Sequence, residues 1–90
     1  MPWKVEIDTK AAREIRALPR HDQQRITSKI QALADNPRPP GCVKLSGTSK
    51  LWRIRAGVYR IIYQILDDRL LVIVVRVGHR RDVYRDMPSQ

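Results

Sequence analysis

The alternation of apolar and polar side chains predicts that the chain begins with a strand and then forms a helix. Residues 3–8 alternate apolar and polar side chains, which is typical of a half-buried strand. Asp8 or Thr9 is expected to cap the helix that follows, because a short oxygen-bearing side chain accepts a hydrogen bond from an unpaired backbone N–H. Pro19 is expected to end or kink this helix. Its apolar positions recur at helical spacing and are Ala11, Ile15 and Leu18.

A second helix is predicted from about His21 to Asp35. Its polar side chains are expected to face water, and its apolar positions form one stripe, which consists of Ile26, Ile30, Leu33 and Ala34. The segment 36–41 contains three prolines and a glycine and cannot continue a helix. It therefore predicts a stiff loop.

The second half of the chain is rich in β-branched and aromatic residues. It contains four candidate strands, at residues 43–45, 51–55, 59–66 and 70–77. The intervening segments at 46–49, 56–57 and 67–69 are short enough for turns and hairpins. A polar segment at 79–85 is expected to form a short helical turn. The order β-α-α-β-β-β-β predicts one α+β domain over residues 1–90, in which two N-terminal helices pack on a mostly antiparallel sheet.

The charge of the chain points to a phosphate-bearing partner. The 90 residues carry 18 Lys and Arg against 9 Asp and Glu, a formal net charge of +9, and 13 of the basic residues are arginines. Arginine binds phosphate at two points, so an excess of arginine favours nucleic acid first. The alternative is that the charge serves no ligand, since many small soluble proteins are basic. No apolar run is long enough to span a bilayer, and no secretory signal precedes the first strand. The single Cys42 and the absence of Cys/His clusters predict a cytoplasmic protein that needs no metal or cofactor.

Arginines alternate with apolar residues in the segment 52–55. Trp52 and Ile54 should face one side of the sheet, and Arg53 and Arg55 the other. If Ala56 and Gly57 form a two-residue loop, Arg60 lies opposite Arg53, and three guanidinium groups converge on one face. This arrangement suits a bound anion. The alternative is a solvated edge strand on which arginine prevents aggregation, and a loop one residue longer would reverse the register.

Four sequence blocks resemble the RelE/ParE toxin superfamily. They occur in order over nearly the whole chain, at residues 44–47, 52–55, 59–63 and 77–84, and the last block resembles the RelE branch. The resemblance implies a toxin of a bacterial or archaeal toxin–antitoxin pair. RelE-like members enter the ribosomal A site and cut messenger RNA there without a metal. The implied partners are the ribosome, mRNA and a RelB-like antitoxin, which is expected to be acidic and partly disordered.

The resemblance also implies which residues form the site. Carried over residue by residue, the catalytic positions fall on Arg53, Arg55, Arg60, Arg80 and Tyr84. The first two positions are commonly lysine in well-known members, so arginine here keeps the charge but removes an amine proton carrier. His79 is a reserve proton carrier. The residues expected to bind RNA are Lys44, Lys50, Arg53, Arg55, Arg81 and Arg85.

Metal-free cleavage of RNA uses the neighbouring 2′-hydroxyl as the nucleophile. The site must remove the proton of that hydroxyl, stabilise a more negative phosphorane and protonate the leaving 5′-oxygen. Guanidinium groups suit the second task, but they are poor bases because their pKa lies above about 12. Two alternatives stay open. One is a ParE-like inhibitor of DNA gyrase on the same fold, and the other is an RNA-binding module that does not cleave.

Overall fold

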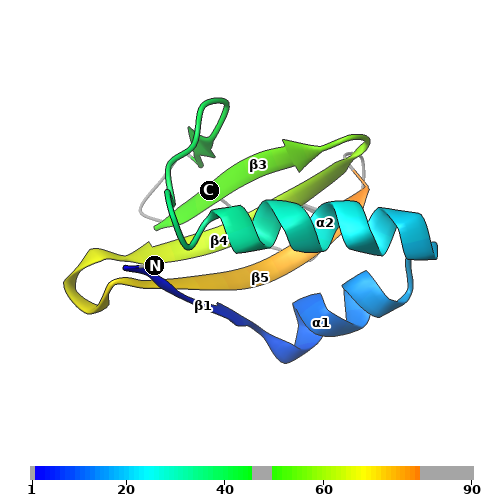
Figure 1. Ribbon diagram of the computed structural model, residues 1–90, viewed down its shortest axis with the longest axis horizontal. Coiled ribbons are helices and arrows are strands. Elements are labelled where there is room, and N and C mark those ends of the chain that lie inside the picture. Colours follow the sequence, from blue (N-terminus) through cyan, green and yellow to red (C-terminus); the bar gives the residue numbers. More distant parts are fainter. Residues whose placement is uncertain (1, 46–49, 80–90) are drawn as a thin grey trace.

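Two helices cover one face of a five-stranded sheet in the computed structural model, which describes residues 2–45 and 50–79 (Figure 1). The predicted order of strands and helices is confirmed. The elements are β1 (Lys4–Ile7), α1 (Thr9–Arg16), α2 (Arg20–Ala32), β2 (Val43–Lys44), β3 (Leu51–Ala56), β4 (Tyr59–Leu66), the 3-10 turn η1 (Asp67–Arg69) and β5 (Leu71–His79). The predicted C-terminal helical turn lies outside the described residues. Neither helix is long and apolar enough to cross a membrane, among the residues described.

The sheet is mixed, with the strand order β1-β5-β4-β3-β2. The three pairs that β2, β3, β4 and β5 form in succession are antiparallel, whereas β1 runs parallel to β5. The first and last strands of the described chain are therefore neighbours. With three antiparallel pairs and one parallel pair among the described strands, the sheet agrees with the expectation of a mostly antiparallel sheet.

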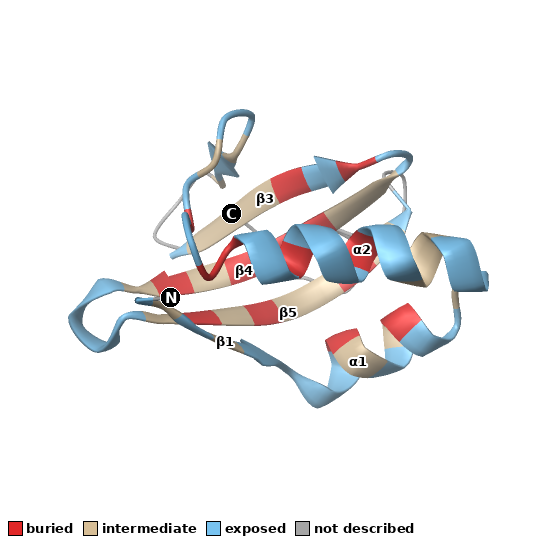
Figure 2. Ribbon diagram, viewed as in Figure 1, coloured by how far each residue is buried: buried red, intermediate tan, exposed pale blue. Residues whose placement is uncertain are grey.

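The hydrophobic core lies between the helices and the sheet (Figure 2). The predicted stripe of α2 is buried, and so is the apolar face of α1. The strand residues that meet them are Ile54, Ala56, Ile61, Tyr63, Ile65, Val72, Val74 and Val77. Every second residue of β3 points into this core, as the sequence pattern predicted. The residues between them face away from the helices.

The start of α1 differs from the expectation. Asp8 occupies the cap position, but its side chain makes no capping hydrogen bond, so the predicted side-chain cap is wrong. Instead the Asp8 N–H donates to the Val74 carbonyl at 2.9 Å, and the Asp8 carbonyl accepts from the Ala12 N–H at 2.9 Å. The backbone of Asp8 thus links the end of β1 to β5 and to the first turn of α1.

The β3–β4 turn consists of Gly57 and Val58, because Ala56 pairs with Tyr59. Arg55 therefore lies opposite Arg60, and the predicted pairing of Arg53 with Arg60 is wrong. Two observations explain the difference. Ala56 is only 1% exposed and stays in the strand to fill the core. Gly57 adopts a positive φ of 63°, which places the left-handed turn conformation on the glycine.

Glu14 of α1 forms hydrogen bonds with the edge of β5 beyond the end of β1. The last residue of β1, Ile7, pairs with Val74, so β1 does not reach the end of β5. There the Val77 N–H donates to Glu14 Oε1 at 2.9 Å. Arg76 Nε donates to Glu14 Oε2 at 3.1 Å. A carboxylate thus replaces a neighbouring strand at this edge.

Candidate functional site

Three of the predicted arginines share the sheet face that lies opposite the helices. Arg53 and Arg55 alternate with the buried Ile54, and Arg60 lies directly across from Arg55. The register differs from the predicted one by two residues, and side chains alternate with a period of two. Each side chain therefore keeps its predicted face. We call these three residues the arginine face.

The arginine face is suited to bind an anion. Guanidinium groups directly opposite one another repel, and such a pair in a sheet is destabilising. The Nε atom of Arg53 is buried and has no hydrogen-bond partner among the described residues. Arg53 and Arg55 also form no ion pair with any side chain in the described ranges. A phosphate bound between the guanidinium groups would pair with their positive charge and offset the repulsion.

A small hollow of about 70 Å³ adjoins the arginine face at the hairpin. It is lined by Arg55, Gly57, Tyr59 and Arg60. The Tyr59 hydroxyl donates to Asp22 Oδ2 at 3.1 Å. Partial burial, and then this hydrogen bond, raise the pKa of Tyr59. The hydrogen bond thus fixes the Tyr59 ring beside the hollow.

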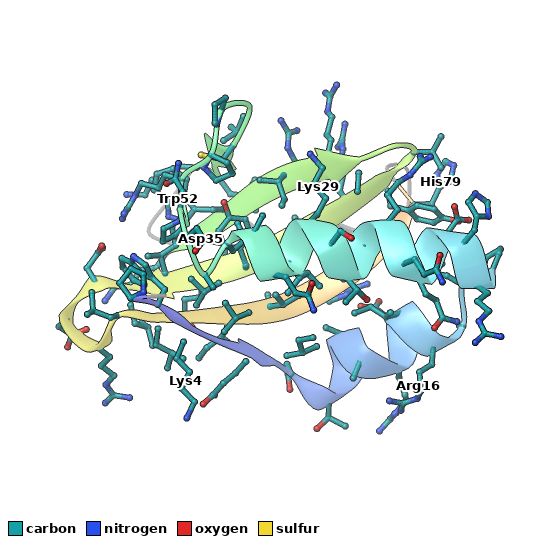
Figure 3. All side chains as sticks on the ribbon, in the orientation of Figure 1. Lys4, Arg16, Lys29, Asp35, Trp52 and His79 are labelled. Atoms are coloured by element: carbon teal, nitrogen blue, oxygen red, sulfur yellow. The ribbon has the colours of Figure 1, made fainter. Side chains whose placement is uncertain are left out.

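His79 lies at the end of β5, across from Tyr59 (Figure 3). The two rings meet edge to face, with their centroids 6.4 Å apart and an interplanar angle of 80°. Because directly paired residues share a face, His79 lies on the helix side with Tyr59, whereas Gly78 lies opposite Arg60. The structure therefore does not bring the His79 side chain onto the arginine face.

The two predicted RNA-binding lysines gather at the other end of β3. Lys44 and Lys50 line a hollow of about 320 Å³ together with Trp52 and Arg38. Trp52 and His79 lie at opposite ends of the sheet in Figure 3. Lys44 pairs with Trp52, so it lies on the helix side and not on the arginine face. The predicted basic residues that the structure describes thus lie in two separate regions.

Arg38 was not predicted as a site residue. Its guanidinium lies 5.0 Å from the centre of the Trp52 ring. It donates to both carboxylate oxygens of Asp67, at 2.9 and 3.2 Å, and these hydrogen bonds lower the pKa of Asp67. Asp67 is 29 residues away in the chain, so no local pattern indicates this contact.

The remaining predicted residues lie outside the described part of the chain. They are Arg80, Arg81, Tyr84 and Arg85. Within residues 2–45 and 50–79, no group of three or more His, Cys, Asp or Glu side chains is placed to hold a metal ion.

Comparison with known proteins gives consistent matches. The family model described as the ParE toxin of the type II toxin–antitoxin system parDE matches residues 5–84. The toxin RelG of Mycobacterium tuberculosis is 36% identical over 93 residues, which cover 94% of this chain and 99% of that protein. The mRNA interferase toxin RelE of Escherichia coli is 29% identical over 90 residues, with 96% and 94% covered. In the crystal structure of the M. tuberculosis RelBE2 toxin–antitoxin complex, a chain superimposes with a TM-score of 0.79 at 27% identity, covering 89% of this chain and 100% of that chain.

Proposed function

The chain belongs to the RelE/ParE superfamily of toxins of type II toxin–antitoxin systems, and we propose that it is a metal-independent endoribonuclease that cleaves mRNA in the ribosomal A site. The observation that carries the proposal is the arginine face, on which Arg53, Arg55 and Arg60 present their guanidinium groups together. The similarity to an mRNA interferase toxin over most of both chains supports the same activity.

In the proposed reaction, the 2′-hydroxyl of one nucleotide attacks the adjacent phosphorus, and the bond to the 5′-oxygen breaks. Arg55 and Arg60 bind the phosphate oxygens from two neighbouring strands. Arg53 adds a third guanidinium group on the same face, with no ion pair to any described side chain. Charge on the phosphorane grows in the transition state, so these donors bind it more tightly than the substrate.

In this proposal other groups transfer the protons, because guanidinium groups stay protonated at neutral pH and cannot act as bases. We propose Arg80 as a further stabiliser of the transition state. Tyr84 then stacks on a base or carries a proton. His79 is a weaker candidate for a proton carrier, because its ring packs against Tyr59 on the helix side of the sheet.

The proposed partner is a RelB-like antitoxin, acidic and partly disordered. The similar solved structure is a toxin–antitoxin complex. A net charge of +9 favours an acidic polypeptide that covers basic surfaces of this chain. Toxin, mRNA and ribosome would meet in the cytoplasm.

Single-turnover cleavage of mRNA on programmed ribosomes tests the proposed function. Arg60→Gln, Arg80→Ala and Tyr84→Ala are each compared with Arg16→Ala, which alters an exposed arginine of α1. Loss of one preorganised stabiliser is expected to slow cleavage about 10²–10³-fold, whereas Arg16→Ala should cleave at the wild-type rate. Equal rates in all four variants would refute the assignment.

Mapping transcript 5′ ends after induction, with and without ribosomes, separates the alternatives. Ribosome-dependent cuts within codons support the proposal. Intact transcripts accompanied by DNA damage would instead indicate a ParE-like gyrase inhibitor, which the matching family model favours as second candidate. Intact RNA that is bound in a strongly salt-dependent way would indicate a non-catalytic RNA-binding module.

A further inference from the structure

Helix α2 brings two more basic residues to the β3–β4 hairpin. The guanidinium of Arg25 packs over Gly57, with its Nη1 atom 2.5 Å from the position that a Cβ atom would occupy. Lys29 follows one helical turn later and lies on the β3 side of α2, whereas Arg16 lies on α1 far from the hairpin (Figure 3). Glycine at position 57 thus allows the close approach of Arg25.

Lys29 and Arg55 flank a groove of about 110 Å³ between α2, β3 and the loop at 39–41. Its floor is apolar and includes Pro39, Pro40 and Ile54. Strand β2 pairs with Trp52 and Arg53, and no strand among the described residues pairs with the C-terminal part of β3 on this side. The groove therefore crosses a part of the sheet edge that no strand from residues 2–45 or 50–79 covers.

Arg55 connects this groove with the arginine face. Its side chain lines the groove, and it also lines the hairpin hollow together with Arg60. The side chains of Arg25, Lys29 and Arg55 form no hydrogen bond or ion pair with residues 2–45 or 50–79. Three cations that have no acidic partner in the described part of the chain thus lie along one route from the arginine face to α2.

We infer that Arg25, Lys29 and Arg55 form a second binding site for RNA, which binds phosphates of the single strand beyond the cleaved bond. The inference rests on the proposed function, which places the reactive phosphate on the arginine face. An RNA strand bound at Arg55 would continue toward Lys29 along the part of the β3 edge that no described strand covers. The apolar floor accommodates ribose or base surface between the phosphates. An acidic polypeptide is the competing occupant, but continuity with the arginine face favours RNA.

Binding of a short 2′-O-methyl oligoribonucleotide, which lacks the attacking hydroxyl, tests this site without cleavage. Fluorescence anisotropy gives the affinity between about 50 and 200 mM salt, where each phosphate contact to a single strand contributes about 0.7 to the slope of log K against log salt. The double variant Arg25→Gln/Lys29→Gln is expected to lower the magnitude of this slope by about 1.4. The ratio of wild-type to variant affinity should therefore decrease about 7-fold between about 50 and 200 mM salt. The matched control Arg13→Gln/Arg16→Gln removes two exposed cations of α1 and should keep the wild-type slope.

Three outcomes would overturn the inference. The first is a wild-type slope in the α2 variant with an unchanged circular dichroism spectrum. The second is an equal loss in the α1 control, which would show that only net charge matters. The third is a loss of binding to polyglutamate without any loss for RNA, which would assign the groove to an acidic polypeptide. Ribosomal cleavage is measured separately, so failure of the proposed nuclease activity is distinguishable from failure of this site.

Discussion

Replacement of Glu14 by Ala is expected to destabilise the protein through the end of β5. The carboxylate accepts from the Val77 N–H at 2.9 Å and from Arg76 Nε at 3.1 Å. The two side chains of the ion pair are only 24% and 11% exposed, so water replaces these bonds poorly. Loss of a hydrogen bond to a charged group, with an N–H left unsatisfied, costs about 1–3 kcal/mol per group. We expect the free energy of unfolding to fall by about 2–4 kcal/mol.

Urea unfolding followed by circular dichroism measures this loss. A decrease of 3 kcal/mol corresponds to a melting temperature lower by about 12–24 °C for a domain of this size. Glu14→Gln keeps an acceptor for Val77 but loses the charge opposite Arg76, so it should lie between Glu14→Ala and wild type. Arg13→Ala, an exposed neighbour on the same helix, should stay within about 0.5 kcal/mol of wild type. A Glu14→Ala variant as stable as Arg13→Ala would refute the role of the carboxylate as a substitute strand partner.

Three further predictions concern other contacts. Burial raises the pKa of Tyr63, whose hydroxyl donates to the Pro37 carbonyl at 2.8 Å. Tyr63→Phe should lower the free energy of unfolding by about 1–2 kcal/mol, measured by urea unfolding. The stabilisation by Tyr63 should decrease as pH rises above about 10, the ordinary tyrosine pKa, and ultraviolet titration follows the ionisation. The Arg38 guanidinium lowers the pKa of Asp67. This exposed pair therefore stabilises the fold fully above the ordinary aspartate pKa of about 4, and the stabilisation is lost as pH falls below it. Asp67→Asn should remove this contribution to the acid dependence of the melting temperature. Arg55→Gln should stabilise the fold by about 0.2–1 kcal/mol by removing the repulsion from Arg60, and an unchanged gain in about 1 M KCl would contradict this cause.

Local pattern was sufficient for the elements and for the faces of the strands. The apolar stripe of α2 and the alternation of β3 follow from periods of 3.6 and 2, which are written into neighbouring residues. The wrong hairpin register left Arg53, Arg55 and Arg60 on one face, because an even shift preserves alternation. The arginine face was therefore predictable from sequence even though its pairs were not.

The parts that sequence could not supply depend on contacts between distant segments. Arg25 and Arg38 are ordinary polar residues by pattern, and only packing places one over Gly57 and the other over Trp52. The pairing of β2 with β3 also places Lys44 on the helix side of the sheet, away from the arginine face. The sequence by itself determined the elements, the basic charge and the shared face of three arginines, because these depend on residue type and short periods. Tertiary structure alone decided the turn position, the substitution of Glu14 for a strand and the path of cations over the hairpin, because these depend on how α1 and α2 pack on the sheet.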